Sequence, residues 1–241
     1  MGIRVAVVGA TGRMGKLAVE LVEAAQDLEL HATLDSKSEL SEAIGADVIF
    51  EATNLEASKS VLDFAINQKI NIVIATSGWT ENSIGSATKV VTDSSVVLVP
   101  NFSVGSVLGS KFAAEAAKYF DSIEIVETHH AGKKDSPSGT ATRTAELISA
   151  SRKESGKEVG LVPGVGQEAR GQVVAGIPIH SLRLHSASAK QEVLLAGDQE
   201  LLTISHVATS VQAYAQGILQ AIRFANSTQG LTVGLDKVLG I

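Results

Sequence analysis

The sequence has no cysteine among its 241 residues. This absence excludes disulfide bonds, thiolate metal sites and cysteine nucleophiles, and it fits a cytoplasmic protein. No stretch approaches the roughly 20 consecutive apolar residues that a membrane-spanning helix needs. The N-terminus lacks the charged segment, apolar core and cleavage site of a signal peptide. These absences together predict a cytoplasmic protein without a membrane partner.

Basic residues are also fewer than acidic residues. The chain has 20 lysines and arginines against 26 aspartates and glutamates, so its formal net charge is −6. A net acidic chain is a poor partner for nucleic acid, although a local basic site can still bind an anion. The hydrophobic content of 44% is typical of a globular protein with a buried core.

A glycine-rich turn follows the first apolar run of the chain. Residues 3–8 are nearly all apolar, as in a parallel strand buried on both faces, and GATGRMG follows at once. Gly9 makes the turn, Gly12 lets the backbone approach a pyrophosphate, and Gly15 lets the next helix pack on the sheet. The predicted cofactor contacts in this turn are Gly9, Ala10, Thr11, Gly12, Arg13 and Met14.

An acidic residue follows the second predicted strand, residues 28–34. Asp35 lies about 20 residues after the last glycine of the turn, where a carboxylate can bind the adenosine ribose. This spacing predicts a bound NADH or NADPH. Lys37 could instead pair with a 2′-phosphate, so the choice between the two cofactors stays open.

Strands and helices alternate through the N-terminal part of the chain, with further strands predicted at residues 47–50, 70–75 and 96–99. The alternation predicts a Rossmann-like, doubly wound parallel sheet, in which ligands bind beyond the carboxyl ends of the strands. The turns at residues 51–54, 75–79 and 99–103 should therefore line the nicotinamide side of the site. The predicted contacts are Ala75, Thr76, Ser77, Val99, Pro100, Asn101 and Phe102. Trp79, the single tryptophan, is predicted to be a packing residue on the next helix.

The pattern changes after a helix predicted at residues 106–120. Strands follow at residues 122–127, 177–184, 190–196 and 200–206, and the last three have no crossover helices between them. Such consecutive strands predict a second, α+β domain with a mixed, largely antiparallel sheet. A long excursion is expected at residues 152–171, and an amphipathic helix from Val211 to Ile222.

Two histidines and two lysines are concentrated in residues 127–140, ETHHAGKKDSPSGT, which we interpret as a loop. An imidazole exchanges protons near neutral pH. His129 and His130 are adjacent on an extended segment, so only one of them can face a given reacting atom. Lys133 and the lysine after it add positive charge.

The end of this segment is typical of a helix start. The sequence Ser138-Gly139-Thr140 offers backbone N–H groups that can bind a carboxylate. Residues 127–140 therefore predict a site that binds and protonates an anionic substrate. The other histidines, His31, His180, His185 and His206, are interpreted as structural, with a contact from His206 or residues 180–183 left open; no spaced ligand set predicts a metal.

At residues 127–140 the sequence resembles the 4-hydroxy-tetrahydrodipicolinate reductase (dihydrodipicolinate reductase) family of bacterial lysine biosynthesis. The family's signature E-x-H-H-x-x-K-x-D-x-P-S-G-T is present position for position, and the resemblance extends to VGATGRMG, VPNFSVG, HSLR and GLTVGL. The chain differs from the family pattern at four places. Glu51-Ala52-Thr53 replaces the family's D-F-T, and Ala75-Thr76-Ser77-Gly78 replaces its G-T-T-G. Ala131-Gly132 lacks a basic residue that the family has, and Val211 stands where the family usually has arginine.

The resemblance implies that NADH or NADPH reduces the dehydrated cyclic dicarboxylate to tetrahydrodipicolinate. It implies His129 as general acid/base and Lys133 as proton donor, with the dicarboxylate bound by His130, Lys133, Ser138, Gly139 and Thr140. It also implies a dinucleotide-binding domain at residues 1–103 and 212–241. Residues 104–211 would then form a substrate-binding and oligomerisation domain, through whose sheet a homotetramer assembles.

Two other oxidoreductase classes fail on the sequence. A short-chain dehydrogenase needs Tyr-x-x-x-Lys, but Ile123 follows Tyr119 and Ile218 follows Tyr214 at that spacing. A semialdehyde dehydrogenase needs a cysteine. The remaining alternative is a nucleotide-sensing regulator that has lost catalysis, and the intact proton-donating segment counts against it.

Overall fold

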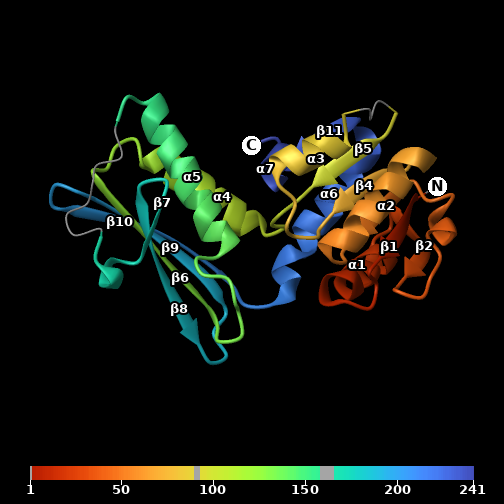
Figure 1. Cartoon of the computed structure of the whole chain (residues 1–241), viewed down its shortest axis with the longest axis horizontal. Helices are drawn as coiled ribbons and strands as arrows, with labels where there is room; N and C mark the ends of the chain where they lie inside the picture. The colour runs from red at the N-terminus through yellow and green to blue at the C-terminus, as the bar shows by residue number, and fades with distance from the viewer. Residues whose placement is uncertain (1, 90–92, 158–165) are drawn as a thin grey trace. The chain divides into compact units, whose positions relative to one another are not determined.

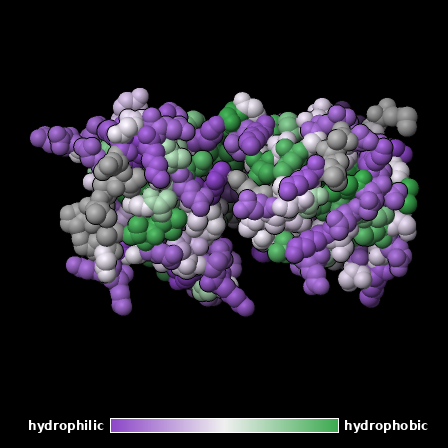
Figure 2. All heavy atoms as spheres, turned by 45° about the horizontal axis from the view of Figure 1, so that its top comes forward, coloured by the Kyte–Doolittle hydropathy of each residue, from purple (hydrophilic) through white to green (hydrophobic). Residues whose placement is uncertain are grey.

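The computed structural model describes residues 2–89, 93–157 and 166–241, and the chain divides into two compact units (Figure 1). The first unit comprises Met1–Val104 and Val211–Ile241, and the second comprises Gly105–Ser210. The described residues of each unit include a sheet and a cluster of buried apolar side chains. Hydrophilic side chains cover much of the visible surface, with apolar patches between them (Figure 2). No helix in the described part of the chain is long and apolar enough to cross a membrane.

The first unit contains a six-stranded parallel sheet in the order β11-β5-β4-β3-β1-β2. The strands are β1 (Ile3–Val8), β2 (Leu28–Leu34), β3 (Val48–Glu51), β4 (Asn71–Ile74), β5 (Ser95–Leu98) and β11 (Gly230–Val233). The predicted parallel sheet is confirmed. Strand β11 was not predicted, because it is short and only partly buried and so lacks the continuous apolar run of the inner strands.

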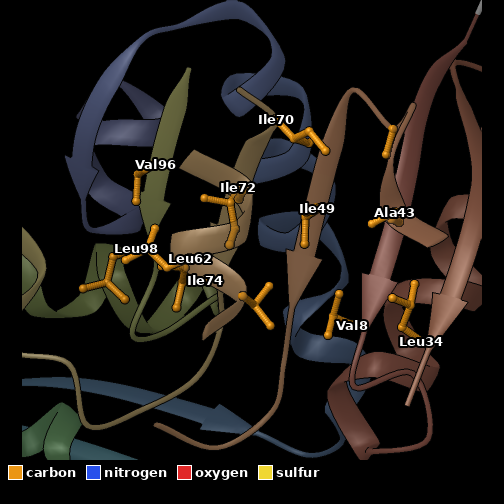
Figure 3. Close-up of a cluster of buried hydrophobic side chains, with 14 of the residues drawn as sticks. Val8, Leu34, Ala43, Ile49, Leu62, Ile70, Ile72, Ile74, Val96 and Leu98 are labelled. Carbon is orange, nitrogen blue, oxygen red and sulfur yellow. The ribbon is translucent and has the colours of Figure 1, made fainter. Parts of the chain in front are cut away.

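Helices pack on this sheet where alternate strand residues point toward them. The helices of the unit are α1 (Arg13–Ala24), α2 (Leu55–Gln68), α3 (Glu81–Ala87), α6 (Ala215–Ser227) and α7 (Leu235–Leu239), with the 3₁₀ turns η1 (Leu40–Ala43) and η3 (Val211–Tyr214). In the core, Ile49 and Ile72 of adjacent strands lie with Leu62 of α2 (Figure 3). Helix α6 packs on β3, β4 and β5 and contacts α1.

Two predictions for this unit were wrong in detail. The last long helix begins at Ala215 rather than Val211, because Val211–Tyr214 form the turn η3. Trp79 precedes the N-cap of α3 instead of lying on the helix, although it is a packing residue as predicted. Its indole N–H donates to the Ser58 hydroxyl at 3.0 Å.

The second unit contains a five-stranded sheet in the order β10-β9-β6-β8-β7. Its strands are β6 (Ser122–His130), β7 (Gln172–Val174), β8 (Ile177–Leu184), β9 (Ala189–Gly197) and β10 (Glu200–Ala208). Among the described strands of this sheet, only β6 and β8 pair in parallel, so the predicted mixed sheet is confirmed. Its helical elements are α4 (Val104–Ala116), α5 (Gly139–Glu154) and the 3₁₀ turn η2 (Glu168–Arg170). Alanines of α4 and α5 pack on the apolar face of the sheet.

Strand β6 continues three residues further than predicted, to His130. His129 and His130 therefore lie on a strand, and the interpretation of all residues 127–140 as a loop was wrong. The parallel pairing with β8 continues to His130 and Leu184, and these backbone hydrogen bonds extend the strand through polar residues that carry no apolar pattern. Of the excursion predicted at residues 152–171, residues 158–165 lie outside the described part of the chain.

Candidate functional site

One face of the second sheet changes from apolar to polar along its strands. The buried isoleucines of β6 are followed on the same face by Glu127 and then His129. Glu127 pairs with Ser181 of β8 on one side and with Gln191 of β9 on the other. Gln191 in turn pairs with His206 of β10. Residues far apart in the sequence thus form one polar row across four strands.

Glu127 is fully buried and charged. The Arg183 guanidinium donates to both of its carboxylate oxygens, at 2.9 and 2.8 Å, and the backbone N–H of Ser138 donates to Oε1 at 3.2 Å. Burial by itself raises the pKa of Glu127. Hydrogen bonds from Arg183, Ser181 and His129 nevertheless hold that pKa below its ordinary value of 4.5, so the group is an anion at neutral pH.

His129 is held by this anion. Its Nδ1 lies 2.6 Å from Glu127 Oε2, and its side chain is 17% exposed. A carboxylate can only accept a hydrogen bond, so Nδ1 must carry the proton. Nε2 is then the ring nitrogen that can exchange a proton with a ligand.

Lys133 is tied to the same group through Asp135. Its Nζ donates to the Asp135 carboxylate at 2.8 Å, and the Asp135 carbonyl accepts from Arg183 Nη2 at 2.6 Å. The hydrogen bond from Lys133 holds the pKa of Asp135 below its usual range. The lysine side chain stays 23% exposed, so it can also reach a ligand.

The start of α5 lies beside Glu127. The Ser138 hydroxyl accepts from the Ala141 N–H at 3.2 Å and caps the helix, while the Ser138 N–H donates to Glu127. Both groups of Ser138 are therefore engaged within the protein. Gly139 is exposed, and a Cβ placed there would meet no atom within 4 Å, so this position has room for a ligand. Thr140 follows it and is partly buried.

The remaining histidines divide between structural and site positions. His130 is exposed and leaves β6 on the face opposite His129, as the alternation of strand residues predicts. His206 lies in the polar row, and its ring packs so closely on Gly105 that a Cβ at this glycine would lie 2.8 Å from the ring. Burial lowers the pKa of His206. His180 contacts Glu124 at 2.6 Å on the opposite face. His31 and His185 make local contacts.

The glycine turn of the first unit fits a dinucleotide phosphate. A Cβ on Gly9, whose φ is +86°, would overlap the carbonyl of Ala52, and one on Gly15 would overlap the carbonyl of Gly9. The N-cap residue of α1 is Gly12, which offers no side chain to cap the helix, whereas Asn54 caps α2. The uncapped N-terminus leaves backbone N–H groups and the positive end of the helix dipole for an anion. Ala10, Thr11, Arg13 and Met14 line the same turn and are at least partly exposed.

Asp35 follows β2 at the same edge of the sheet. It is exposed, and its Oδ1 accepts from the Lys37 N–H at 2.8 Å. The Ser38 hydroxyl lies 3.4 Å from the same oxygen. The turn thus holds the carboxylate in one orientation at the protein surface.

A second buried carboxylate, Glu51, joins the turns that follow β3 and β4. It accepts from the N–H and hydroxyl of Thr53, from the Ser58 hydroxyl at 2.6 Å and from the Thr76 hydroxyl at 2.8 Å. The Thr53 N–H also contacts the Thr76 hydroxyl at 2.8 Å. The turns after β3 and β4, both predicted to line the nicotinamide side, are therefore connected to each other through the buried side chain of Glu51. The sequence alone did not reveal this role of Glu51.

The other predicted nicotinamide contacts differ in accessibility. Ala75 and Ser77 lie beside Thr76 with their backbone at the end of β4, and Ser77 is exposed. After β5, Pro100 is exposed while Val99 is buried, and the Asn101 side chain accepts from the Ser103 N–H at 2.9 Å. The Phe102 ring is buried 5.8 Å from that of Phe50, so only its backbone remains for a cofactor. Among the described residues, no three acidic or histidine side chains are grouped as a metal site requires.

Known proteins resemble the chain over almost its whole length. Residues 3–102 match the family description "Dihydrodipicolinate reductase, N-terminus", and residues 105–239 match "Dihydrodipicolinate reductase, C-terminus". The chain is 49% identical to 4-hydroxy-tetrahydrodipicolinate reductase of Clavibacter sepedonicus, covering 99% of this chain and 87% of that protein. It is 44% identical to the enzyme of the same name from Streptomyces griseus, with coverage of 99% and 98%.

A solved structure also resembles the chain in fold. It is a dipicolinate-bound dihydrodipicolinate reductase from Paenisporosarcina sp. TG-14, with a TM-score of 0.82 and 32% sequence identity. The match covers 98% of this chain and 99% of that one.

Proposed function

The chain belongs to the dihydrodipicolinate reductase family, and we propose that it reduces 4-hydroxy-tetrahydrodipicolinate to tetrahydrodipicolinate with NADH or NADPH, in lysine and diaminopimelate biosynthesis in the cytoplasm. The observation that carries the proposal is the shared anion Glu127, which binds both the imidazole of His129 and the first turn of α5. A proton-exchanging group and an anion-binding helix start are thereby held together. A cyclic dicarboxylate that must be protonated requires this combination.

The first unit would hold the cofactor. Gly9–Met14 would bind the pyrophosphate, Asp35 the adenosine ribose, and the turns at residues 75–77 and 99–102 the nicotinamide. The uncapped start of α1 and the close backbone packing that Gly9 permits in the turn support the first of these contacts. When bound, NADH or NADPH supplies a hydride.

The second unit would supply the protons. His129 acts as general acid/base through Nε2 while the substrate loses its hydroxyl group and a ring proton as water. Lys133 then donates a proton to the ring carbon next to the one that accepts the hydride. One hydride and one proton thus saturate one C=C bond, and the exposure of both side chains supports these roles.

The carboxylates of the substrate would be bound by the first turn of α5 and by basic side chains. The backbone N–H groups of Gly139 and Thr140 would bind a carboxylate, and Ser138 caps the helix at this turn. Lys133 and His130 are the basic groups, although His130 would have to approach from the strand end because it leaves β6 on the other face. The bound dipicolinate in the Paenisporosarcina enzyme supports a cyclic dicarboxylate as ligand.

Turnover tests this proposal. Dihydrodipicolinate synthase would generate the substrate in situ from pyruvate and aspartate semialdehyde, and oxidation of NADH and of NADPH would be followed separately. We expect substrate-dependent oxidation of at least one of them. Tight nucleotide binding with no turnover would instead support the nucleotide-sensing regulator.

The assigned roles predict that His129→Gln or Lys133→Ala lowers kcat by about 10²–10⁴-fold and leaves the Kd for the nucleotide unchanged. Lys134→Ala is the matched control, since Lys134 is the exposed neighbour of Lys133. His185→Gln controls for loss of a histidine near the same strand end. Wild-type kcat in both test variants would rule out the two roles.

A homotetramer is the assembly that we propose. The face of the second sheet opposite its core carries exposed apolar side chains at Val173, Leu182, Leu184, Leu201 and Val207. A second copy of the chain would cover this open sheet face, because exposed apolar area of this kind favours association. Sedimentation velocity should show a tetramer, and Leu182→Asp with Leu201→Asp should dissociate it.

A further inference from the structure

Glu127 directly contacts His129, Arg183 and the start of α5. It binds His129 Nδ1 at 2.6 Å, both terminal nitrogens of Arg183 at 2.9 and 2.8 Å, and the Ser138 N–H at 3.2 Å. Arg183 continues the connection to the carbonyl of Asp135, whose carboxylate binds Lys133. We define Glu127, Arg183 and Asp135 as the positioning cluster.

We propose that Glu127 is the positioning residue of the reaction: it selects the Nδ1-protonated form of His129 and holds the start of α5 at a fixed place beside the ring. The inference rests on the proposed function, because it concerns how His129 and α5 act on the dicarboxylate. Glu127 is fully buried and cannot itself touch the substrate. Its effect must therefore pass through the groups that it binds.

The hydrogen-bond inventory of the cluster explains why this position requires an anion. A guanidinium and a backbone N–H can only donate, and together they face both oxygens of Glu127. A carboxylate accepts from all of them and still accepts from His129. A glutamine would turn its NH₂ toward an Arg183 nitrogen in either orientation of the amide. In one orientation the NH₂ also replaces the acceptor of the His129 ring, and in the other it faces the Ser138 N–H.

A matched carboxylate lies on the opposite face of the same strand. Glu124 of β6 also contacts an arginine and a histidine, namely Arg170 and His180 at 2.6 Å. It has no contact with His129 or with the start of α5 among the described interactions. Glu124→Gln therefore removes the same kind of charge from the same strand without touching the proposed site.

Kinetics separates a positioning role from a structural one. Glu127→Gln should lower kcat by about 10- to 100-fold and raise KM for the dicarboxylate, with an unchanged Kd for the nucleotide. Glu124→Gln, assayed where both variants keep the wild-type assembly, should retain the wild-type kcat. A wild-type kcat in Glu127→Gln would overturn the proposal.

A double-mutant cycle with His129→Gln gives the second test. If Glu127 acts on kcat through the ring, Glu127→Gln should lower kcat little further once the ring is gone. If the two losses multiply, Glu127 acts on kcat independently of the His129 ring and the proposal is wrong. If Glu127→Gln does not fold, Glu127→Asp replaces it in the same double-mutant cycle. The shorter side chain keeps a negative charge near Arg183 but moves it away from His129.

The tautomer of His129 can be measured without any turnover. In the full chain with ¹⁵N-labelled histidine, and at a pH where the ring is neutral, the His129 proton should be on Nδ1; His129→Gln assigns the signal. A proton on Nε2 in the wild-type chain would overturn the inference. An inactive wild-type chain would refute the proposed function and leave this measurement to decide the role of Glu127.

Discussion

Among the described residues, each unit has one completely buried carboxylate near the end of a strand. Glu51 is the last residue of β3 and lies just before the capped helix α2. Glu127 lies near the end of β6 and binds the N–H of the cap of α5. The two carboxylates occupy comparable places, but their partners differ.

Glu51 accepts from three hydroxyl groups and the Thr53 N–H, whereas Glu127 accepts mainly from donors that cannot also accept, namely Arg183 and the Ser138 N–H, besides Ser181 and His129. The hydroxyls of Thr53, Ser58 and Thr76 can each donate or accept, so they can rotate to suit a changed partner. Arg183 and the Ser138 N–H cannot rotate into acceptors. The comparison indicates that Glu51 serves as a hydrogen-bonded junction between turns. Glu127 serves as a charge that the site requires.

The largest expected effect is the loss of stability in Glu127→Gln. Removing the anion leaves the partly buried charge of Arg183 without compensation, which typically costs about 3–5 kcal/mol. Amide hydrogen exchange at β6 and β8 would measure the opening free energy of this sheet, with Glu124→Gln as control. A loss under about 1 kcal/mol would remove the contrast between the two carboxylates.

Acid should remove part of the same stabilisation. The pKa of Glu127 in the folded chain lies below its ordinary value of 4.5, so folding disfavours protonation of this group. Its contribution is complete above pH 4.5 and is lost as the pH falls from there through the folded pKa. Hydrogen exchange at β6 should show a pH-dependent loss in that window, and Glu127→Gln should lack this component.

A smaller loss is expected for Glu51→Gln, about 1 kcal/mol, because the surrounding hydroxyls can accept from the new amide. Trp79 donates to Ser58, which donates to Glu51, so tryptophan fluorescence during urea unfolding reports on this unit. Glu51→Leu, which leaves the hydroxyls without their acceptor, is the contrasting variant and should cost more. A loss in Glu51→Gln as large as in Glu127→Gln would show that Glu51 is also needed as a charge.

The helix caps beside the two carboxylates should show the smallest effects. Asn54→Ala and Ser138→Ala each remove one side-chain acceptor, which costs about 1 kcal/mol, and both leave the carboxylates in place. Asn54→Ser and Ser138→Thr should restore most of the loss. Thermal unfolding of the four variants would measure it. A much larger effect of Ser138→Ala would mean that its hydroxyl does more than cap α5.

The first unit was predicted most fully because its strands are continuous apolar runs between glycines and helical patterns. Strand β1 and the turn from Gly9 to Gly15 were found in this way, because a strand buried on both faces is almost entirely apolar and close backbone approach requires glycine. Strands β7 and β11 show no such pattern, since they are short and partly exposed. The sheet supplies their hydrogen bonds, so pairing rather than local pattern defines them.

The sequence by itself determined which side chains can carry the chemistry. Residue types and spacing predicted a proton-exchanging, anion-binding segment at residues 127–140, and the family resemblance implied the roles of His129 and Lys133. The missing Tyr-x-x-x-Lys and the absence of cysteine excluded two other oxidoreductase classes. Only the tertiary structure decided how these groups are held. Arg183 meets Glu127 because β6 and β8 pair in parallel with His129 opposite Arg183, and that register depends on packing across the whole sheet. The sequence supplied the two side chains proposed to exchange protons, and the sheet register connects both of them to Arg183 and Glu127.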